Sequence, residues 1–68
     1  MKRSKTHSLA VERLKRNLSQ QMLADFTGMG RATIARAERG EPISPQSRQR
    51  LCDYLGKSAE QLGLVIEE

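Results

Sequence analysis

Arginines separated by small residues distinguish positions 31–39 from the rest of the chain. If this segment is helical, 100° per residue brings one set of side chains within about 140° of one another, namely Arg31, Ala32, Ala35, Arg36 and Arg39. Ile34 and Ala37 then point the opposite way. Guanidinium groups bind phosphates and guanine edges, and small neighbours allow close approach to a groove. The pattern indicates a helix that binds a polyanion on one side and packs into a core on the other.

The other reactive side chains do not form a site for catalysis or metal binding. One cysteine, Cys52, and one histidine, His7, cannot supply four zinc ligands. The sequence has no glycine-rich phosphate loop, nucleophile triad or pair of catalytic acids. We therefore expect no enzyme activity, no cofactor and no metal. Cys52 is expected to be a small buried hydrophobe, and His7 a solvated residue.

Length and composition restrict the class of protein. Sixty-eight residues with a single cysteine allow one small domain without disulfides. Aromatic residues make up 3% of the chain, which disfavours a stacking platform for single-stranded nucleic acid. No apolar run exceeds three residues, so we expect no membrane span and no secretory signal. The composition is typical of a soluble, cytoplasmic, all-helical protein.

The net charge of +4 is unevenly distributed. Six cations and one anion give residues 1–18 a charge of +5, and three cations and two anions give residues 19–40 a charge of +1. Three cations and five anions leave residues 41–68 at −2. Such a dipolar molecule would orient toward a polyanion, although a solubilising surface explains the charge alone equally well.

Capping residues predict five short helices, over 8–16, 20–26, 31–39 and 45–55 and around Leu62. Serines that can accept hydrogen bonds from first-turn amides stand at four of the starts, Ser8, Ser19, Ser44 and Ser58. Residues suited to a left-handed conformation stand near the ends, Asn17, Gly28, Gly40 and Gly56. Hydrophobic residues nowhere alternate with period two, so we expect no strands.

The second and third of these helices have the composition of a helix-turn-helix. Ala24 allows a close helix crossing, Gly28 permits a turn of a few residues, and Ile34 anchors the third helix. A small core would join the two helices, made of Leu23, Ala24, Met29, Ile34 and Ala37.

The segment LSQQMLADFTGMGRATIARAERG resembles the phage-repressor/Cro-type helix-turn-helix family, widespread in bacterial xenobiotic-response-type regulators. Leu51-Cys52, Leu55-Gly56 and residues 58–62 match its fourth and fifth helices, so the resemblance covers about residues 8–64. It implies an all-α, compact, five-helix lambda-repressor-like bundle. We expect a flexible basic arm over 1–7, the domain over 8–64 and a short acidic tail over 65–68.

The resemblance also implies roles for individual residues. Gln20 would contact a phosphate, and the third helix would enter the major groove with Arg31, Ala32, Thr33 and Arg36 facing bases or phosphates. Gly30 stands where the family usually has a Ser or Thr cap, and Ser44 would donate to a phosphate. Arg39 is assigned to phosphate contact or solvation rather than base recognition.

Other charged residues are expected to stabilise the fold, or have a role that the sequence does not assign. Arg13 lies on the side of the first helix that carries Leu9 and Leu14, which suggests a paired charge. Family members often join the positions of Arg13 and Glu38 by a buried ion pair; two solvated charges are the alternative. Glu41 follows the third helix, where an acid would weaken DNA binding. The role of Arg48 stays open.

The sequence therefore predicts a sequence-specific, double-stranded-DNA-binding transcriptional regulator, such as a repressor. A weak or DNA-induced homodimer would use the fifth helix and Leu64–Ile66, with no small-molecule ligand. The alternative is a protein-interaction module of the same fold, antitoxin-like or an anti-regulator partner, supported by the acidic C-terminal half, the Glu41 loop and the apolar tail.

Overall fold

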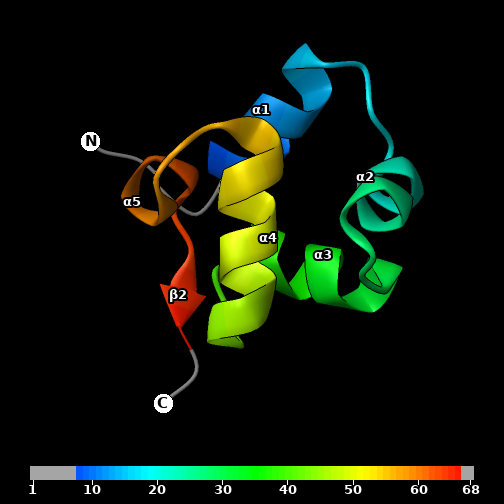
Figure 1. Cartoon of the computed structure of the whole chain (residues 1–68). Coiled ribbons are helices and arrows are strands. Elements are labelled where there is room, and N and C mark those ends of the chain that lie inside the picture. The colour runs from blue at the N-terminus through cyan, green and yellow to red at the C-terminus, as the bar shows by residue number, and fades with distance from the viewer. Residues whose placement is uncertain (1–7, 67–68) are drawn as a thin grey trace.

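Residues 8–66, the part of the chain that the computed structural model describes, form five helices and one pair of two-residue strands (Figure 1). In chain order these are α1 (Ser8–Lys15), α2 (Gln20–Thr27), α3 (Arg31–Glu38), β1 (Pro42–Ile43), α4 (Pro45–Leu55), α5 (Ala59–Leu62) and β2 (Val65–Ile66). The all-α class is confirmed, and the first four helices begin and end within one residue of their predicted bounds. The fifth, expected around Leu62, ends at that residue. The predicted arm over 1–7, with His7, lies outside the described residues.

Serine side chains fix the starts of three helices. The Oγ atoms of Ser19 and Ser44 accept hydrogen bonds from the amides of Met22 (3.0 Å) and Ser47 (3.2 Å). At Ser58 the predicted capping box is complete. Each cap satisfies an amide that has no partner within its helix. Ser8, predicted to be a cap, is instead the first residue of α1.

Among the side chains that the structure describes, ten hydrophobic ones form the buried core, Leu9, Leu18, Leu23, Ala24, Ile34, Ala37, Ile43, Leu51, Leu55 and Leu62. They include four of the five predicted helix-turn-helix core residues, and the fifth, Met29, packs against them partly buried. Leu14 was placed with Leu9 on the inner side of α1, but it is 60% exposed. Five residues turn a helix by about 500°, so these side chains point about 140° apart.

A short parallel strand pair joins two loops, which the sequence did not predict. Pro42 lies opposite Val65 and Ile43 opposite Ile66. Two residues are too few to show a period-two pattern, so β1 and β2 carried no sequence signal. Val65 and Ile66, the first two residues of the predicted tail, form β2, which pairs with β1 and lies beside α4 (Figure 1).

An exposed aromatic pair links α2 and α4. The rings of Phe26 and Tyr54 stack with centroids 5.9 Å apart and an interplanar angle of 25°. Both side chains remain about half exposed. Among the described residues, no helix is long and apolar enough to cross a membrane.

Candidate nucleic-acid interface

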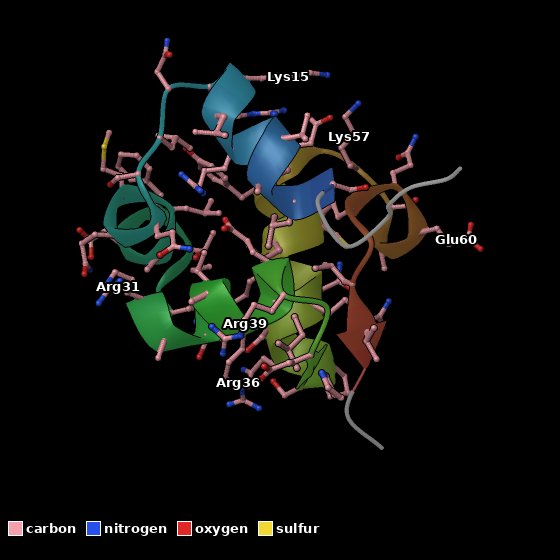
Figure 2. The ribbon with its side chains drawn as sticks, turned by 180° about the vertical axis from the view of Figure 1, so that it is seen from behind. Lys15, Arg31, Arg36, Arg39, Lys57 and Glu60 are labelled. Carbon is pink, nitrogen blue, oxygen red and sulfur yellow. The ribbon has the colours of Figure 1, made fainter. Side chains whose placement is uncertain are left out.

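Helix α3 presents its arginines outward from an apolar back. Ile34 and Ala37 are buried, whereas Arg31, Ala32 and Arg36 are exposed. Figure 2 shows Arg31 at the start of α3 and Arg36 and Arg39 farther along it, away from Lys15 and Lys57. The helix therefore has one side fixed in the core and one cationic side open to a ligand.

The turn before α3 is held at both of its ends. Gly28 has φ of 72°, a left-handed conformation, and the Met29 amide donates to the Ala24 carbonyl at 2.9 Å. From α4, Arg50 Nη1 donates to the Gly28 carbonyl at 3.2 Å and to that of Thr27 at 3.5 Å. Sequence reasoning missed this role of Arg50, because a contact over 22 residues leaves no local signal.

A half-buried ion pair attaches α3 to α1, as predicted. Arg13 Nε lies 2.6 Å from Glu38 Oε2, and Arg13 Nη2 donates to Glu38 Oε1 at 3.3 Å. Arg13 Nη1 also donates to the Leu18 carbonyl at 2.7 Å. With 13% and 10% of the two side chains exposed, the pair is largely removed from water. It fixes the end of α3 that lies farthest from Arg31.

Glu41 lies beside two arginines of the α3 region. Its Oε2 accepts a hydrogen bond from Arg39 Nε at 2.9 Å, and its Oε1 lies 3.7 Å from Arg36 Nε. The hydrogen bond from Arg39 is the main reason that the pKa of the Glu41 carboxyl lies below its usual value, and it raises the pKa of Arg39. The acid predicted to weaken DNA binding is therefore paired with the cations of this surface.

A model of the helix-turn-helix family matches residues 9–62 of the chain. The chain belongs to the Cro/C1-type helix-turn-helix family. Members are DNA-binding regulators of transcription and not an enzyme family, so this chain is a DNA-binding helix-turn-helix regulator. No curated protein and no solved structure gives a significant match.

Not all the predicted DNA-binding residues of this helix-turn-helix domain point to solvent. Gln20 is half-buried, and its Nε2 donates to Glu38 Oε1 at 3.0 Å. Ser44 is also half-buried; its Oγ caps α4 and donates to Ser47 Oγ at 3.0 Å. Thr33 is half-buried on α3. Gly30 caps α3 without a side-chain hydrogen bond. Of the predicted DNA-binding residues, Gly30, Arg31, Ala32 and Arg36 are thus exposed, while Gln20 and Ser44 bond within the chain.

On α4 of the helix-turn-helix domain, Arg48 and Cys52 lie one turn apart and partly buried. Arg48 Nε is enclosed and has no hydrogen-bond partner within the described structure. Burial raises the pKa of the Cys52 thiol, an effect that the positive charge of Arg48 opposes. Within residues 8–66 no three metal-ligating side chains come together. Both residues belong to α4, so neither is part of the arginine-bearing side of α3.

A second group of cations surrounds Glu12, on the helix α1 that precedes the helix-turn-helix. Arg16 Nη1 lies 2.7 Å from Glu12 Oε1, while Lys15 Nζ and Lys57 Nζ lie 3.5 and 3.8 Å from its Oε2. Arg16 Nη2 also donates to the Leu55 carbonyl at 3.0 Å, which attaches α1 to the end of α4. These cations stabilise the packing of α1, and two of them, Lys15 and Lys57, lie away from the arginines of α3 (Figure 2).

Proposed function

We propose that this regulator recognises a specific sequence of double-stranded DNA by placing α3 in the major groove. The observation that supports the proposal is the outward face of α3, where Arg31, Ala32 and Arg36 are exposed while Ile34 and Ala37 anchor the helix. A bidentate arginine–guanine pair provides about 1–3 kcal/mol of discrimination, and an alanine methyl packs against thymine. Occupancy of such a site would regulate transcription.

Contacts to the DNA backbone would orient α3. The amide of Gln20 has two hydrogens on Nε2, so one can donate to a phosphate while the other stays on Glu38. The hydroxyl of Thr33, near the start of α3, would add a further donor. The hydroxyl of Ser44, beyond the end of α3, would donate to a phosphate only by giving up its bond to Ser47 Oγ. At Gly30 the absence of a side chain would let a phosphate approach the first amides of α3.

We further propose that two copies bind adjacent half-sites about one helical turn apart. Val65, which follows α5 and is 43% exposed, is an apolar side chain available for such a pairing, whereas Leu62 is buried in the core. Sedimentation of the protein with duplexes holding one or two half-sites tests this. We expect a two-to-one complex only on the longer duplex, and independent binding to single half-sites would contradict it.

Selection from a pool of random duplexes, followed by binding measurements on the selected sequence, tests the main proposal. We expect log K to fall with log salt by about 0.9 for each phosphate neutralised. Arg31→Ala and Arg36→Ala should each weaken binding to the selected duplex about 5- to 150-fold, which corresponds to the discrimination of one arginine–guanine pair. The control Lys15→Ala removes the same charge away from α3 and should change binding far less.

A protein partner in place of DNA is the competing function. Two of the three features that suggested it from the sequence, the Glu41 loop and the apolar tail, are engaged within the chain, because Glu41 pairs with Arg39 and the backbone of β2 pairs with β1. These contacts favour DNA as the ligand. Selection without any enriched sequence, together with unchanged binding by the arginine variants, would support the protein partner.

A further inference from the structure

Glu41 occupies guanidinium groups that a DNA phosphate would use. Its two carboxylate oxygens are divided between Arg39 and Arg36, at 2.9 and 3.7 Å. Arg36 is held from a second direction, because its Nη2 donates to the Pro42 carbonyl at 3.3 Å. By contrast, no ion pair joins Arg31 to any other residue among 8–66. Within the described structure, Arg31 of α3 is thus unpaired, whereas Arg36 of α3 and Arg39, which directly follows α3, both pair with Glu41.

The backbone keeps Glu41 in this position. The Glu41 amide donates to the Arg36 carbonyl at 3.0 Å, and Gly40 before it has φ of 83°, which favours glycine. On the other side Pro42 and Ile43 form β1, paired with β2, and Ile43 is 2% exposed. The carboxylate thus extends from a segment that is fixed on both sides, and it stays near the two arginines.

Electrostatics makes the carboxylate a competitor of DNA phosphate. A phosphate that binds Arg39 or Arg36 lies close to this like charge, and at the Arg39 Nε–H it must replace the carboxylate as hydrogen-bond acceptor. The pKa of the Glu41 carboxyl is lowered by Arg39, so the group is anionic at neutral pH. The pair is about half exposed, so salt screens it, and DNA can displace it.

We propose that Glu41 is a specificity-determining residue, which suppresses binding to unmatched DNA by competing with phosphate for Arg36 and Arg39. The inference rests on the proposed recognition of DNA by α3. An unmatched duplex offers Arg36 and Arg39 only phosphates, which must lie beside the carboxylate or displace it. A matched duplex draws Arg36 to a base edge instead, so fewer phosphates have to lie beside Glu41. Glu41 therefore lowers affinity for unmatched duplexes more than for the matched one, which raises the ratio of specific to nonspecific affinity.

The test compares Glu41→Gln with the original chain on the selected duplex and on a scrambled one of equal length. Glu60→Gln is the matched control, because it removes the same charge from an exposed side chain of α5, away from α3 (Figure 2). At about 50 mM salt we expect Glu41→Gln to bind the scrambled duplex roughly 3- to 10-fold more tightly, with a salt slope steeper by about one phosphate. The gain on the selected duplex should be smaller, and Glu60→Gln should change either affinity less than twofold.

The outcomes separate this inference from the proposed function. Equal affinities for Glu41→Gln and Glu60→Gln, with the original chain still selecting one sequence, would overturn the role of Glu41 alone. An equal gain on both duplexes would also overturn it, because specificity would then be unchanged. If no protein binds any duplex, both proposals fail. A thermal unfolding midpoint matched between the variants confirms that the comparison is between folded proteins, and Glu41→Ser replaces Glu41→Gln if the latter unfolds.

Discussion

At the scale of single residues, Arg13 belongs to the least exposed ion pair among residues 8–66. Its guanidinium bonds to Glu38 and to the Leu18 carbonyl while remaining only 13% exposed. We expect Arg13→Ala to lower the free energy of unfolding by about 3–5 kcal/mol, because Glu38 would be left largely buried without its partner. Urea unfolding of the two proteins measures the change.

The control for Arg13→Ala is Arg39→Ala, which breaks an ion pair whose side chains are about half exposed. Solvent and salt already screen that pair, so a much smaller loss is expected. Similar losses for the two variants would mean that the Arg13–Glu38 pair contributes no more than a solvated one.

Glu12 should make stability depend on pH. The hydrogen bond from Arg16, with the charges of Lys15 and Lys57, holds the pKa of the Glu12 carboxyl below the ordinary 4.5. A depressed pKa in the folded state stabilises the fold at pH values above the unfolded pKa, and this stabilisation is lost as pH falls through the folded pKa. The unfolding midpoint of Glu12→Gln should therefore be lower than that of the original chain at neutral pH and converge with it in acid.

Thermal unfolding from about pH 7 down to about pH 3 measures this convergence. Glu60→Gln, at an exposed position with no ion pair among residues 8–66, should follow the original chain throughout. A constant gap between Glu12→Gln and the original chain across this range would show that the ionisation of Glu12 is not what stabilises α1.

At the scale of elements, the turn of the helix-turn-helix depends on Gly28. Gly28 and Gly56 have nearly equal φ, 72° and 68°, but an added Cβ would lie 3.1 Å from Arg50 Nη1 at Gly28 and meet nothing within 4 Å at Gly56. Each change to alanine should cost about 1–2 kcal/mol for the left-handed conformation. Gly28→Ala should cost about 0.5–1.5 kcal/mol more, because Arg50 must give up its hydrogen bonds to the turn.

Urea unfolding compares these two glycine variants. Only Gly28→Ala should also weaken DNA binding, since it alters the turn that orients α3. Equal losses of stability would mean that Arg50 moves aside without cost and does not hold the turn.

A side-chain cap at the start of α3 should make the protein more stable. Gly30 is in the extended conformation (φ −82°, ψ 152°) that a capping serine adopts, and an added Cβ meets nothing within 4 Å. Gly30→Ser should raise the free energy of unfolding by about 0.5–1 kcal/mol, through a cap hydrogen bond and a less flexible unfolded chain. Gly30→Ala lacks the hydroxyl and is the control in thermal unfolding. A stability of Gly30→Ala equal to that of Gly30→Ser would rule out a contribution from the cap.

The helices could be predicted from sequence because their signals are local. A capping serine and its amide lie three residues apart, as at Ser19, and a left-handed end needs one residue, as at Asn17 with φ of 58°. The arginine face of α3 follows from helical periodicity. Leu14 shows the limit of this reasoning, because the width of the buried stripe on α1 depends on which helices cover it.

At the scale of the whole molecule, the β1–β2 pair joins the loop after α3 to the segment after α5. Ile43 of β1 is 2% exposed, whereas Val65 of β2 is 43% exposed. Ile43→Ala should therefore cost about 2–5 kcal/mol through lost burial and a cavity. Val65→Ala should cost under about 1 kcal/mol, since its side chain is largely solvated. Urea unfolding tests this, and equal small losses would show that the strand pair lies outside the cooperative core.

Contacts between distant segments explain what the sequence could not predict about the site. The outward position of Arg31 and Arg36 follows from one helix alone. The bond from Gln20 to Glu38 joins residues 18 apart, and it depends on how α2 crosses α3. The pairing of the Glu41 carboxylate with both Arg36 and Arg39 depends on the conformation of the loop after α3. That conformation is stabilised by the pairing of β1 with β2. Composition showed the charges but not their pairing.

The stack of Phe26 on Tyr54 gives this small protein an intrinsic optical probe. The chain has one tyrosine and no tryptophan, so its ultraviolet emission comes from a ring that bridges α2 and α4. Any event that separates these helices changes the surroundings of that single fluorophore. Unfolding, and rearrangement of α2 on DNA, can therefore be followed on the unlabelled chain.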